Sequence, residues 1–581
     1  MPIRTSESLP NPQRLGSFFL EEDMTPTMTG AALLLHALRD HGITTLFGIP
    51  GAMNLPIYDA LDRSGIRHIL TRHEQGAVHA AEGFARSSGR IGTCLATSGP
   101  AATNLITGLG DALLDHLPLL ALTGNVPTHL QGTRAFQELD IVSIARPVTK
   151  GAFQARTASQ IPALVREAVR LAQSGKPGPV LIDLPHDVQL QQTPMGVHFQ
   201  PEPQARVTSH PRSYRAVMDH LKAADRPVLL IGAGAQDATR VQPFVDTTGI
   251  PVVHTLQGIG ILPAAHPQRV GMPGVYGSSR ANQTLSQADL ILGIGVRFDD
   301  RLTGKLALFA PQARIIHIDL DPLEFGRLLQ PALSVQARAE EAFEALSALA
   351  EPLNLEAWWA QIRRFAEYIP PAQWSMTQVL QTLRTVLNPD DLIATDVGHH
   401  QMLAAHHCAP SRPRHWLTSG GLGTMGYALP AAAGAAIAHP NQRVICICGD
   451  GGFQMTHQEL STLTAHQLNV KVLVLDNGHL GMVRQYQDLF TPSGRQQVEL
   501  ASSNPDFARL ALAYHIPAVT VRHGEQLRDV MQQWFTHPGP SLLHAIVPAE
   551  ENIPVVPAGR QLTDWVVRAE PPTPACPTSA R

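Results

Sequence analysis

Two short segments of the sequence place oxygen-bearing side chains directly after apolar runs. The first is Gly449–Gly452 (GDGG), which follows the run RVICIC, and the second is Asp476–Asn477, which closes the run VKVLVLD. Apolar runs of this length are typical of buried parallel strands, and open α/β sheets bind ligands at the carboxyl ends of their strands. We therefore expect Asp450 and Asn477 to lie side by side at one edge of a sheet.

A carboxylate and an amide oxygen in that position suit Mg²⁺, which prefers octahedral oxygen coordination and shares its ligands with phosphates and water. A backbone carbonyl near His479 would complete the protein ligands offered by Asp450 and Asn477. The glycines of GDGG let backbone amides approach a diphosphate, and a helix opening at Gly452 would point its positive end there. A lone GDG is also a common turn, but the Asn at a second strand end favours a metal–diphosphate site.

Length and composition describe a multidomain globular protein. The chain has 581 residues, and at roughly 150 residues per domain it should form three or four domains. It is 44% hydrophobic and 16% charged, and its net charge of -4 comes without long basic or acidic runs, so no nucleic-acid or membrane-surface partner is expected. Scattered cysteines, no bilayer-length apolar run and no signal-peptide pattern predict a soluble, reduced, cytoplasmic protein.

Helical and strand-like patterns alternate along the chain, which predicts an α/β fold of three doubly wound parallel-sheet domains. We place these domains at residues 25–190, 205–350 and 370–550, with a Gln/Pro-rich linker at 189–212 and a loosely held tail at 551–581. Strand–turn–glycine patterns recur at similar positions in the first and third domains. This recurrence suggests that one fold is used twice.

The metal motif resembles that of thiamin diphosphate enzymes, in which GDG is followed at a similar distance by Asn. Those enzymes usually have Asn-Asn where this chain has Asp476 and Asn477. The second of the two positions normally binds the metal, so Asn477 keeps that role. The resemblance implies thiamin diphosphate and Mg²⁺ as cofactors.

Thiamin chemistry needs a carboxyl group beside the aminopyrimidine ring of the cofactor, where it supports general acid–base catalysis. Glu74 is the candidate, because it lies between the strand-like IRHIL and a helix of small residues. Without the metal motif, Glu74 would be interpreted as an acid that favours a helix N-terminus. In the enzymes that this chain resembles, the glutamate reaches the cofactor of the partner subunit, so a homodimer is implied.

The segment 418–430 (TSGGLGTMGYALP) resembles the loop that bends thiamin diphosphate, with Met425 as the apolar wedge between its two rings. A methionine in a glycine-rich loop is otherwise most often a packing residue. The resemblance assigns further cofactor contacts to Gly51, Val397, Gly398, His399, His400, Gly423, Met425, Gly449, Gly451, Gly452, Met455, Leu480, Gly481 and Met482.

Across residues 29–548 the chain resembles the catalytic subunit of acetolactate synthase, also called acetohydroxyacid synthase. The segments that carry this resemblance appear in the family's order and include TSGPAATN, GTRAFQELDIV, GKPGPVLIDLPHDVQ, IIHIDLDP and GMVRQYQ. The resemblance implies decarboxylation of pyruvate and transfer of the fragment to a second 2-oxo acid, giving acetolactate for branched-chain amino acid biosynthesis. It also implies a dimer or tetramer with sites between subunits, and a possible small regulatory subunit.

The same resemblance assigns Phe136, Gln137 and Lys150 to the channel that leads to the reacting carbon, although a lysine is more often a solvated surface charge. It makes the second domain a site for FAD, which would serve structure because the reaction has no net redox change. The FAD contacts it implies are Gly232, Gly234, Arg297, Asp299 and Asp319. Taken without the resemblance, the glycines of IGAGA are a weak phosphate-loop signal, and a tight strand–helix turn is the alternative.

Four positions depart from the family pattern: Ala52, Asn125, Arg134 and Tyr486 stand where Gly, Gln, Asp and Trp are usual. The family tryptophan is associated with a preference for 2-oxobutyrate as acceptor, so the acceptor preference stays open. Glyoxylate carboligase shares the Gly-Ala at Ala52 but has Val at the position of Glu74. A related carboligase or decarboxylase acting on glyoxylate or another 2-oxo acid is therefore the alternative function.

Overall fold

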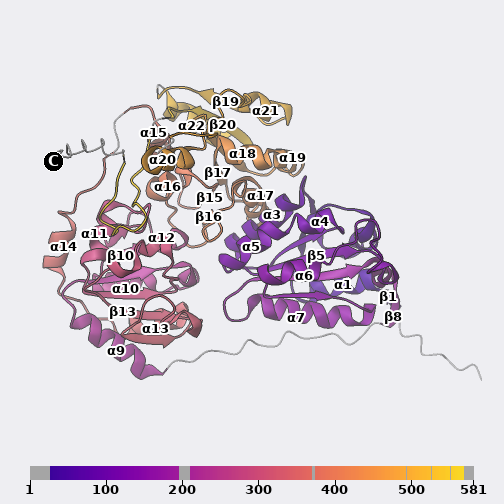
Figure 1. The fold of residues 1–581 in the computed structure, drawn as a ribbon, viewed down its shortest axis with the longest axis horizontal. Coiled ribbons are helices and arrows are strands. Elements are labelled where there is room, and N and C mark those ends of the chain that lie inside the picture. The colour runs from indigo at the N-terminus through magenta and orange to yellow at the C-terminus, as the bar shows by residue number, and fades with distance from the viewer. Residues whose placement is uncertain are drawn as a thin grey trace, which may run out of the picture.

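The computed structural model describes residues 27–194, 210–369, 373–491, 494–524, 526–549 and 551–567. Three α/β domains follow one another along the chain (Figure 1): the first at the right of the view, the second at the lower left, and the third above and between them. Each contains one six-stranded parallel sheet. The predicted fold class is confirmed.

The first domain begins with a short antiparallel pair, in which β1 (Thr27–Thr29) meets β8 (Gln192–Pro194). Its main sheet has the order β3-β2-β4-β5-β7-β6. The strands are β2 (Thr45–Gly48), β3 (Arg67–Leu70), β4 (Gly92–Ala96), β5 (Leu119–Asn125), β6 (Gly151–Gln154) and β7 (Pro179–Pro185). The helices are α1 (Gly30–Asp40), α2 (Leu55–Leu61), α3 (Glu74–Ser88), α4 (Pro100–Thr103), α5 (Ile106–Leu114), α6 (Ile141–Ala145), α7 (Ile161–Gln173) and α8 (His186–Leu190).

The second domain has the strand order β11-β10-β9-β12-β13-β14. Counted from its first strand this order is 3-2-1-4-5-6, the arrangement that binds dinucleotides where the strand order reverses. The strands are β9 (Pro227–Ile231), β10 (Val252–His254), β11 (Arg269–Gly271), β12 (Leu290–Ile294), β13 (Arg314–Asp319) and β14 (Leu333–Gln336). The helices are α9 (Pro211–Lys222), α10 (Val241–Thr248), α11 (Ser279–Gln287), α12 (Asp300–Thr303), α13 (Ala339–Leu349) and α14 (Glu356–Ile362).

The third domain repeats the topology of the first, because its order β16-β15-β17-β18-β20-β19 places corresponding strands in corresponding positions. The strands are β15 (Leu392–Thr395), β16 (Trp416–Thr418), β17 (Val444–Gly449), β18 (Val470–Asp476), β19 (Ala518–Val521) and β20 (Ser541–Ile546). The helices are α15 (Met376–Arg384), α16 (His399–His407), α17 (Ala428–Ala438), α18 (Asp450–Thr456), α19 (Leu460–Ala465), α20 (Gly481–Phe490), α21 (Phe507–Ala513) and α22 (Leu527–Thr536). The reuse of one fold suggested by the sequence is present in the structure.

Helices α3 and α17 join the first domain to the third (Figure 1). A side chain at Gly83 would collide with the backbone of Ala431, and one at Gly434 would collide with Ala80. These reciprocal contacts show that the two helices run antiparallel with their backbones touching. Glycine is required at both positions because only its missing Cβ allows so close an approach.

The carboxyl-terminal region differs from the loosely held tail expected at 551–581. Val555, Val556 and Leu562 are buried, and Val555 pairs with Val566. Asn282 of the second domain donates a hydrogen bond to the carbonyl of Leu562 at 3.0 Å. The described part of this segment therefore packs against the second domain, and residues 568–581 lie outside the described residues.

The expected linker coincides partly with regular elements, and the two cysteines of β17 lie in the core. The linker placed at 189–212 includes the end of α8 and all of β8, and its residues 195–209 lie outside the described part of the chain. Cys446 and Cys448 are fully buried on β17, in agreement with their interpretation as core residues. Among the described residues, no helix is long and apolar enough to cross a bilayer.

Candidate active site

The predicted metal ligands meet at the ends of neighbouring strands. β17 ends at Gly449, which pairs with Leu475 of β18, so Asp450 and Asn477 follow strand ends that lie side by side. Both side chains are buried, at 2% and 7% exposure. The helix after the motif begins at Asp450, two residues before the start expected at Gly452.

Hydrogen bonds hold these two oxygens in place. Asn504 donates from Nδ2 to Asp450 Oδ2 at 2.9 Å and to Asp476 Oδ1 at 3.0 Å. The backbone N–H of His479 donates to Asn477 Oδ1 at 3.2 Å, which puts His479 beside the amide as expected. Burial raises the pKa of Asp450 to about 7, and the neighbouring Asp476 adds to the rise. A divalent cation would relieve the cost of burying this carboxylate.

Asp476, to which the sequence assigned no role beside Asn477, has a structural role. Its Oδ1 accepts a hydrogen bond from the N–H of Gly478, and its Oδ2 lies 3.0 Å from Nε2 of His544. Burial acts to raise the pKa of Asp476, but the hydrogen bonds with His544 and Gly478, the charge of His544 and the contact with Asp450 together outweigh burial, so the pKa is lowered. Asp476 thus fixes the turn that presents Asn477.

The predicted diphosphate contacts surround the same strand ends. The nine-residue helix α16 begins at His399, and Gly398 precedes it with φ 151°. His400 Nε2 accepts a hydrogen bond from the N–H of Gly449 at 3.2 Å. Nε2 of His399 is buried and has no hydrogen-bond partner within the described residues. In the tautomer that carries its hydrogen on Nε2, this buried nitrogen at a helix N-terminus would donate to an anionic group such as a diphosphate.

Met425 lies over the glycines of the metal motif. A Cβ at Gly451 would lie 3.5 Å from Met425 Cε and 2.8 Å from Leu480 Cδ2, so these apolar side chains border the motif. Gly423 adopts φ +75° and has open space around it. The loop between β16 and α17, residues 419–425, is called the wedge loop below.

Asp396 is a functional residue that the sequence reasoning missed. It directly follows β15, and its carboxylate accepts hydrogen bonds from the N–H groups of Val397, Gly426 and Ala428 at 2.9 to 3.2 Å. It therefore anchors the end of the wedge loop to the diphosphate segment. The available signal was its position directly after an apolar run, as for Asp450.

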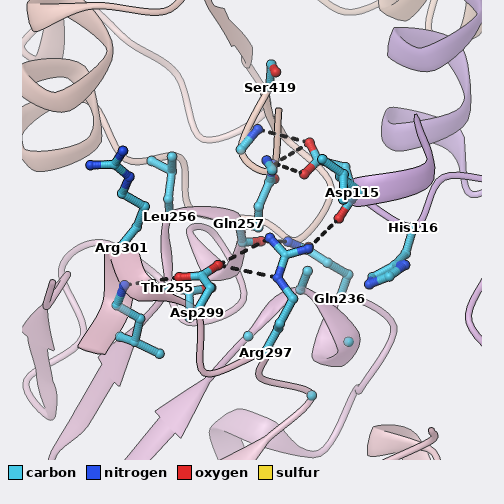
Figure 2. A pocket seen from close by; sticks show the side chains of 18 of the residues that line it. Asp115, His116, Gln236, Thr255, Leu256, Gln257, Arg297, Asp299, Arg301 and Ser419 are labelled. Carbon is cyan, nitrogen blue, oxygen red and sulfur yellow. Dashed lines mark hydrogen bonds and ion pairs between the residues drawn. The ribbon is translucent and has the colours of Figure 1, made fainter. Parts of the chain in front are cut away.

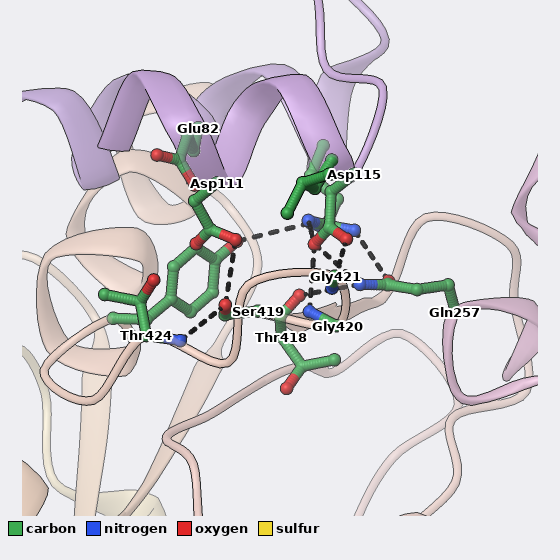
Figure 3. Close-up of polar contacts among 12 residues, drawn as sticks. Glu82, Asp111, Asp115, Gln257, Thr418, Ser419, Gly420, Gly421 and Thr424 are labelled. Carbon is green, nitrogen blue, oxygen red and sulfur yellow. Dashed lines mark hydrogen bonds and ion pairs between the residues drawn. The ribbon is translucent and has the colours of Figure 1, made fainter. Parts of the chain in front are cut away.

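Carboxylates from the first domain hold the wedge loop from the other side (Figure 3). Asp115 accepts hydrogen bonds from the N–H groups of Gly420 and Gly421 at 3.0 and 2.7 Å. Asp111 accepts one from Ser419 Oγ at 2.8 Å. Neither aspartate was singled out by the sequence reasoning, because contact between domains leaves no local pattern.

Glu74 begins α3 at the carboxyl edge of the first sheet, as expected. Asn104 donates from Nδ2 to Glu74 Oε2 at 2.9 Å. Glu459 of the third domain accepts hydrogen bonds from the N–H groups of Arg72 and His73, which fixes the turn before Glu74. Gln137 lies at the same edge, where Ser98 Oγ donates to it at 3.5 Å.

Within one chain, Glu74 is distant from Met425. Arg86, near the end of α3, bonds to Tyr427 beside the start of α17. The twelve residues from Glu74 to Arg86 span about 18 Å of helix, at 1.5 Å per residue. The carboxyl edge of the first sheet and that of the third therefore lie at opposite ends of the α3–α17 pair.

The three predicted channel residues do not gather in one place. Phe136 is 84% exposed on a loop that follows β5. Lys150 lies at the opposite edge of the sheet, because its N–H bonds to Pro179 at the start of β7. Its ammonium donates to the carbonyls of Ser174 and Lys176, so the structure separates Lys150 from Phe136 and Gln137 of the same chain.

Gly51 and Met455, which the resemblance also assigned to the cofactor, occupy different parts of the chain: Gly51 lies in the first domain, whereas Met455 lies on the helix that begins at Asp450 and packs beside Gly426. Gly51 follows β2 at the carboxyl edge of the first sheet, and its N–H bonds to Asn54. Met455 lies on α18 and is 52% exposed. Gly481 begins α20, where a Cβ would approach both Asn477 and His399, and Met482 lines the cavity described next.

A cavity of 1520 Å³ lies among the three domains (Figure 2). Gly232 and Gly234 line it at the end of β9, and a Cβ at Gly234 would lie 2.8 Å from Gly295, which follows β12. Strands β9 and β12 are the pair at which the strand order reverses, so this is the expected dinucleotide position. The cavity is larger than the roughly 300–1,000 Å³ usual for small ligands.

The other predicted FAD contacts line this cavity as well. Arg297 donates to the carbonyl of Leu114 at 2.8 Å and to Asp299 at 3.2 Å (Figure 2). Asp319 ends β13, where burial raises its pKa and Lys176 of the first domain lies 3.8 Å away. The cavity wall continues to Met482 and Tyr486 of the third domain, so the second-domain pocket extends to α20, the helix that follows the proposed metal ligand Asn477.

The four departures from the family pattern occupy different places. Asn125 donates to Asp183 at 2.7 Å and so supports the sheet edge below the Phe136 loop. Arg134 is exposed with φ +61°, and Ala52 begins a single turn after Gly51. Tyr486 lines the cavity; burial raises the pKa of Tyr276, and the hydrogen bond with Tyr486 adds to the rise.

Comparison with known proteins identifies all three domains. Residues 28–144, 214–346 and 396–545 match the models of the thiamine pyrophosphate enzyme N-terminal TPP binding domain, central domain and C-terminal TPP binding domain. Thiamine pyrophosphate and thiamin diphosphate are the same cofactor.

Among curated proteins, the acetolactate synthase isozyme 2 large subunit of Escherichia coli (strain K12) is 42% identical over 542 residues, covering 92% of this chain and 98% of that protein. Acetolactate synthase 2, chloroplastic, of Nicotiana tabacum is 39% identical over 98% of this chain and 90% of its own length. The isozyme 1 large subunit of the same Escherichia coli strain is 40% identical over 93% of this chain and 97% of its own length.

Proposed function

This chain belongs to the thiamine pyrophosphate enzyme family and, within it, to the acetolactate synthase large subunits, and from that premise we propose that it decarboxylates pyruvate and joins the fragment to a second 2-oxo acid. With pyruvate as acceptor the product is acetolactate, a precursor for branched-chain amino acids. The observation that carries this proposal is the placement of Asp450 and Asn477 at adjacent strand ends beneath Met425.

Each part of the site has a role in this reaction. Thiamin diphosphate, when bound, would supply a deprotonated ring carbon as the nucleophile toward the 2-oxo acid, and a ring that accepts the electron pair released when CO₂ leaves. Asp450, Asn477 and the backbone near His479 would hold Mg²⁺, and the start of α16 would bind the diphosphate oxygens. Met425 would press the cofactor into its bent form, and Glu74 would exchange a proton with its aminopyrimidine ring.

The function is tested by incubating purified protein with pyruvate, thiamin diphosphate, Mg²⁺ and FAD, and measuring acetolactate. We expect acetolactate from pyruvate alone and a mixed product when 2-oxobutyrate is added. The same assay also measures the acceptor preference, as the ratio of the mixed product to acetolactate. This ratio is of interest because Tyr486, on the cavity wall, stands where the family has tryptophan. Consumption of glyoxylate with no turnover of pyruvate would contradict the proposal and favour the related carboligase.

The second domain is proposed to bind FAD. The support is its 3-2-1-4-5-6 strand order and the close packing of Gly234 against Gly295 at the point of reversal. The cavity beside these glycines reaches from the second domain to Met482 and Tyr486. FAD would bind in this space as a structural element, because the condensation transfers no net electrons.

The active form is proposed to be a dimer, or a tetramer of two dimers, with each site built from two chains. Glu74 and Gln137 lie at one end of the α3–α17 pair, whereas Asp450 and Met425 lie at the other end. Phe136, on the Glu74 side, exposes 84% of its surface, which suits an apolar side chain that a second copy covers. A two-fold axis would bring Glu74 of each chain to the cofactor of the other.

This arrangement predicts complementation between two inactive variants. Glu74→Gln and Asp450→Ala chains, co-expressed with different tags, should form mixed dimers in which one of the two sites is intact. A random mixture should therefore recover about a quarter of the wild-type activity, since half of the dimers are mixed. Activity that stays at the level of the separate variants would show that each site is built within one chain.

A small regulatory subunit is proposed as a further partner, because the Escherichia coli relatives are named as large subunits. The cytoplasmic location expected from the sequence stays a prediction.

A further inference from the structure

A group of ionisable side chains is enclosed between α3, α5 and the wedge loop, away from the metal edge. His79 and Glu82 of α3 and Asp111 of α5 are each fully buried. One ligand-type atom from each lies within 4.8 Å of the others. The proposed reaction assigns no role to these three residues.

The charges in this group do not balance if both carboxyls are ionised. Arg86 is the cation beside them. Its Nη2 donates to Asp115 at 2.6 Å, and its Nε and Nη1 donate to Tyr427 and Gln257. His79 Nδ1 lies 3.2 Å from Glu82 Oε1, and burial lowers the pKa of His79, so this imidazole is neutral. Two buried carboxylates in contact cannot both stay charged without a further cation.

Each of these two carboxyl groups also has one oxygen without a hydrogen-bond partner among the described residues. Glu82 Oε2 and Asp111 Oδ2 are buried and have no hydrogen-bond partner in the described part of the chain. A buried oxygen without a partner costs free energy unless a proton links it to a neighbour. A single proton held between the two carboxyls would satisfy both oxygens and remove one negative charge.

We propose that Glu82 and Asp111 share one proton, and that this shared proton makes them a positioning pair for the wedge loop. The connection runs through Ser419, which donates to Asp111 Oδ1 at 2.8 Å and accepts a hydrogen bond from the N–H of Thr424 at 2.8 Å (Figure 3). Thr424 immediately precedes Met425. The pair is thus two hydrogen bonds away from the backbone of the proposed cofactor wedge.

The surroundings favour the shared proton. Burial is the main cause that raises the pKa of both Glu82 and Asp111, and the contact of Asp111 with Glu82 adds to its rise. The other groups that face the pair are His79 and Arg86 of α3, Asp115 after α5, Cys94 of β4 and Tyr427 before α17, and Asp396 after β15 faces His79. Both oxygens of Asp115 already accept hydrogen bonds, from Arg86 and from the wedge-loop amides, so the carboxyl oxygens of this group that lack a partner among the described residues are those of Glu82 and Asp111.

Stability measured against pH tests the shared proton without any assay of turnover. The folded wild type binds one proton that the unfolded chain has lost above the usual carboxyl range. As the pH rises, the folding equilibrium constant of the wild type should therefore fall tenfold per pH unit relative to that of Glu82→Gln, until the pH reaches the pKa of the pair. The Gln amide can donate to Asp111 Oδ2 in place of the proton. Glu344→Gln, which changes an exposed carboxyl on α13, is the matched control and should show a constant ratio to wild type.

The shared proton would be overturned if the folding equilibrium constants of wild type and Glu82→Gln kept a constant ratio from pH 5.5 to 8, as those of wild type and Glu344→Gln should. Should the variant not fold, infrared spectra of the wild-type protein in D₂O at pH 8 decide the matter. A protonated carboxyl held in the interior gives a C=O band apart from the amide absorption, and its absence would overturn the proposal. A divalent ion bound by both carboxylates would also leave this band absent.

The link to the wedge loop rests on the proposed function and has its own readout. Ser419→Ala removes the connection to Thr424 and should weaken Mg²⁺-dependent binding of thiamin diphosphate roughly tenfold, as for loss of a hydrogen bond to a charged group. Its stability should keep the pH dependence of wild type. Unchanged cofactor affinity in Ser419→Ala would overturn the positioning role. Because binding is measured directly, this result is separate from any failure to form acetolactate.

Discussion

Replacing Glu74 by Gln is expected to lower the rate of acetolactate formation by at least about 100-fold, within the usual contribution of a positioned acid–base group. Glu74 is held by Asn104 and by the turn that Glu459 fixes, so the amide should occupy the same place. It cannot exchange a proton with the aminopyrimidine ring. The measurement is kcat with saturating pyruvate and cofactors.

Cofactor binding separates a chemical role of Glu74 from a structural one. The Gln variant should still bind Mg²⁺ and thiamin diphosphate, as followed by fluorescence quenching. Glu167→Gln on α7, which alters an exposed carboxyl paired with Arg170, should keep wild-type turnover and serves as the control. If Glu74→Gln turned over pyruvate within a fewfold of this control, Glu74 would not be the activating acid.

Replacing Asp450 by Ala is expected to abolish measurable activity and to weaken Mg²⁺-dependent binding of thiamin diphosphate by more than about 100-fold. Loss of residues that only support metal ligands commonly costs 10–100-fold in metal affinity, so loss of the ligand itself should cost more. Asp450 is 2% exposed and bonds to Asn504, which leaves its other oxygen for the ion. Calorimetric titration of Mg²⁺ with cofactor present provides the measurement.

Asp476→Asn is the matched control for this experiment. Asp476 is the adjacent carboxylate on the same strand end, and the Asn oxygen can still accept the hydrogen bond from Asn504. Its effect on Mg²⁺ affinity should stay within about 10–100-fold, below that of Asp450→Ala, since a supporting partner is altered and no ligand is lost. A larger loss in Asp476→Asn than in Asp450→Ala would assign the metal to Asp476.

The strand-end motifs could be predicted from the sequence because their signals are local. The runs before Gly449 and Asn477 are apolar enough to form buried parallel strands, and a parallel sheet brings the carboxyl ends of its strands to one edge. The position of Glu74 at a strand–helix turn, the two-fold use of one fold and the glycines at the end of β9 follow from the same kind of pattern. Each depends on residues that are close neighbours in the chain.

The relative placement of these parts was decided only by tertiary structure. Gly83 and Gly434 bring α3 and α17 together antiparallel, and this single packing contact places Glu74 at the opposite end of α3 from Arg86 and the wedge loop, along about 18 Å of helix. The same contact between domains brings Asp111 and Asp115 to Ser419 and the adjacent glycines. Hydrophobic periodicity reports which face of a helix is buried but not which distant helix covers it, so residues that act across a domain boundary could not be found from the sequence alone.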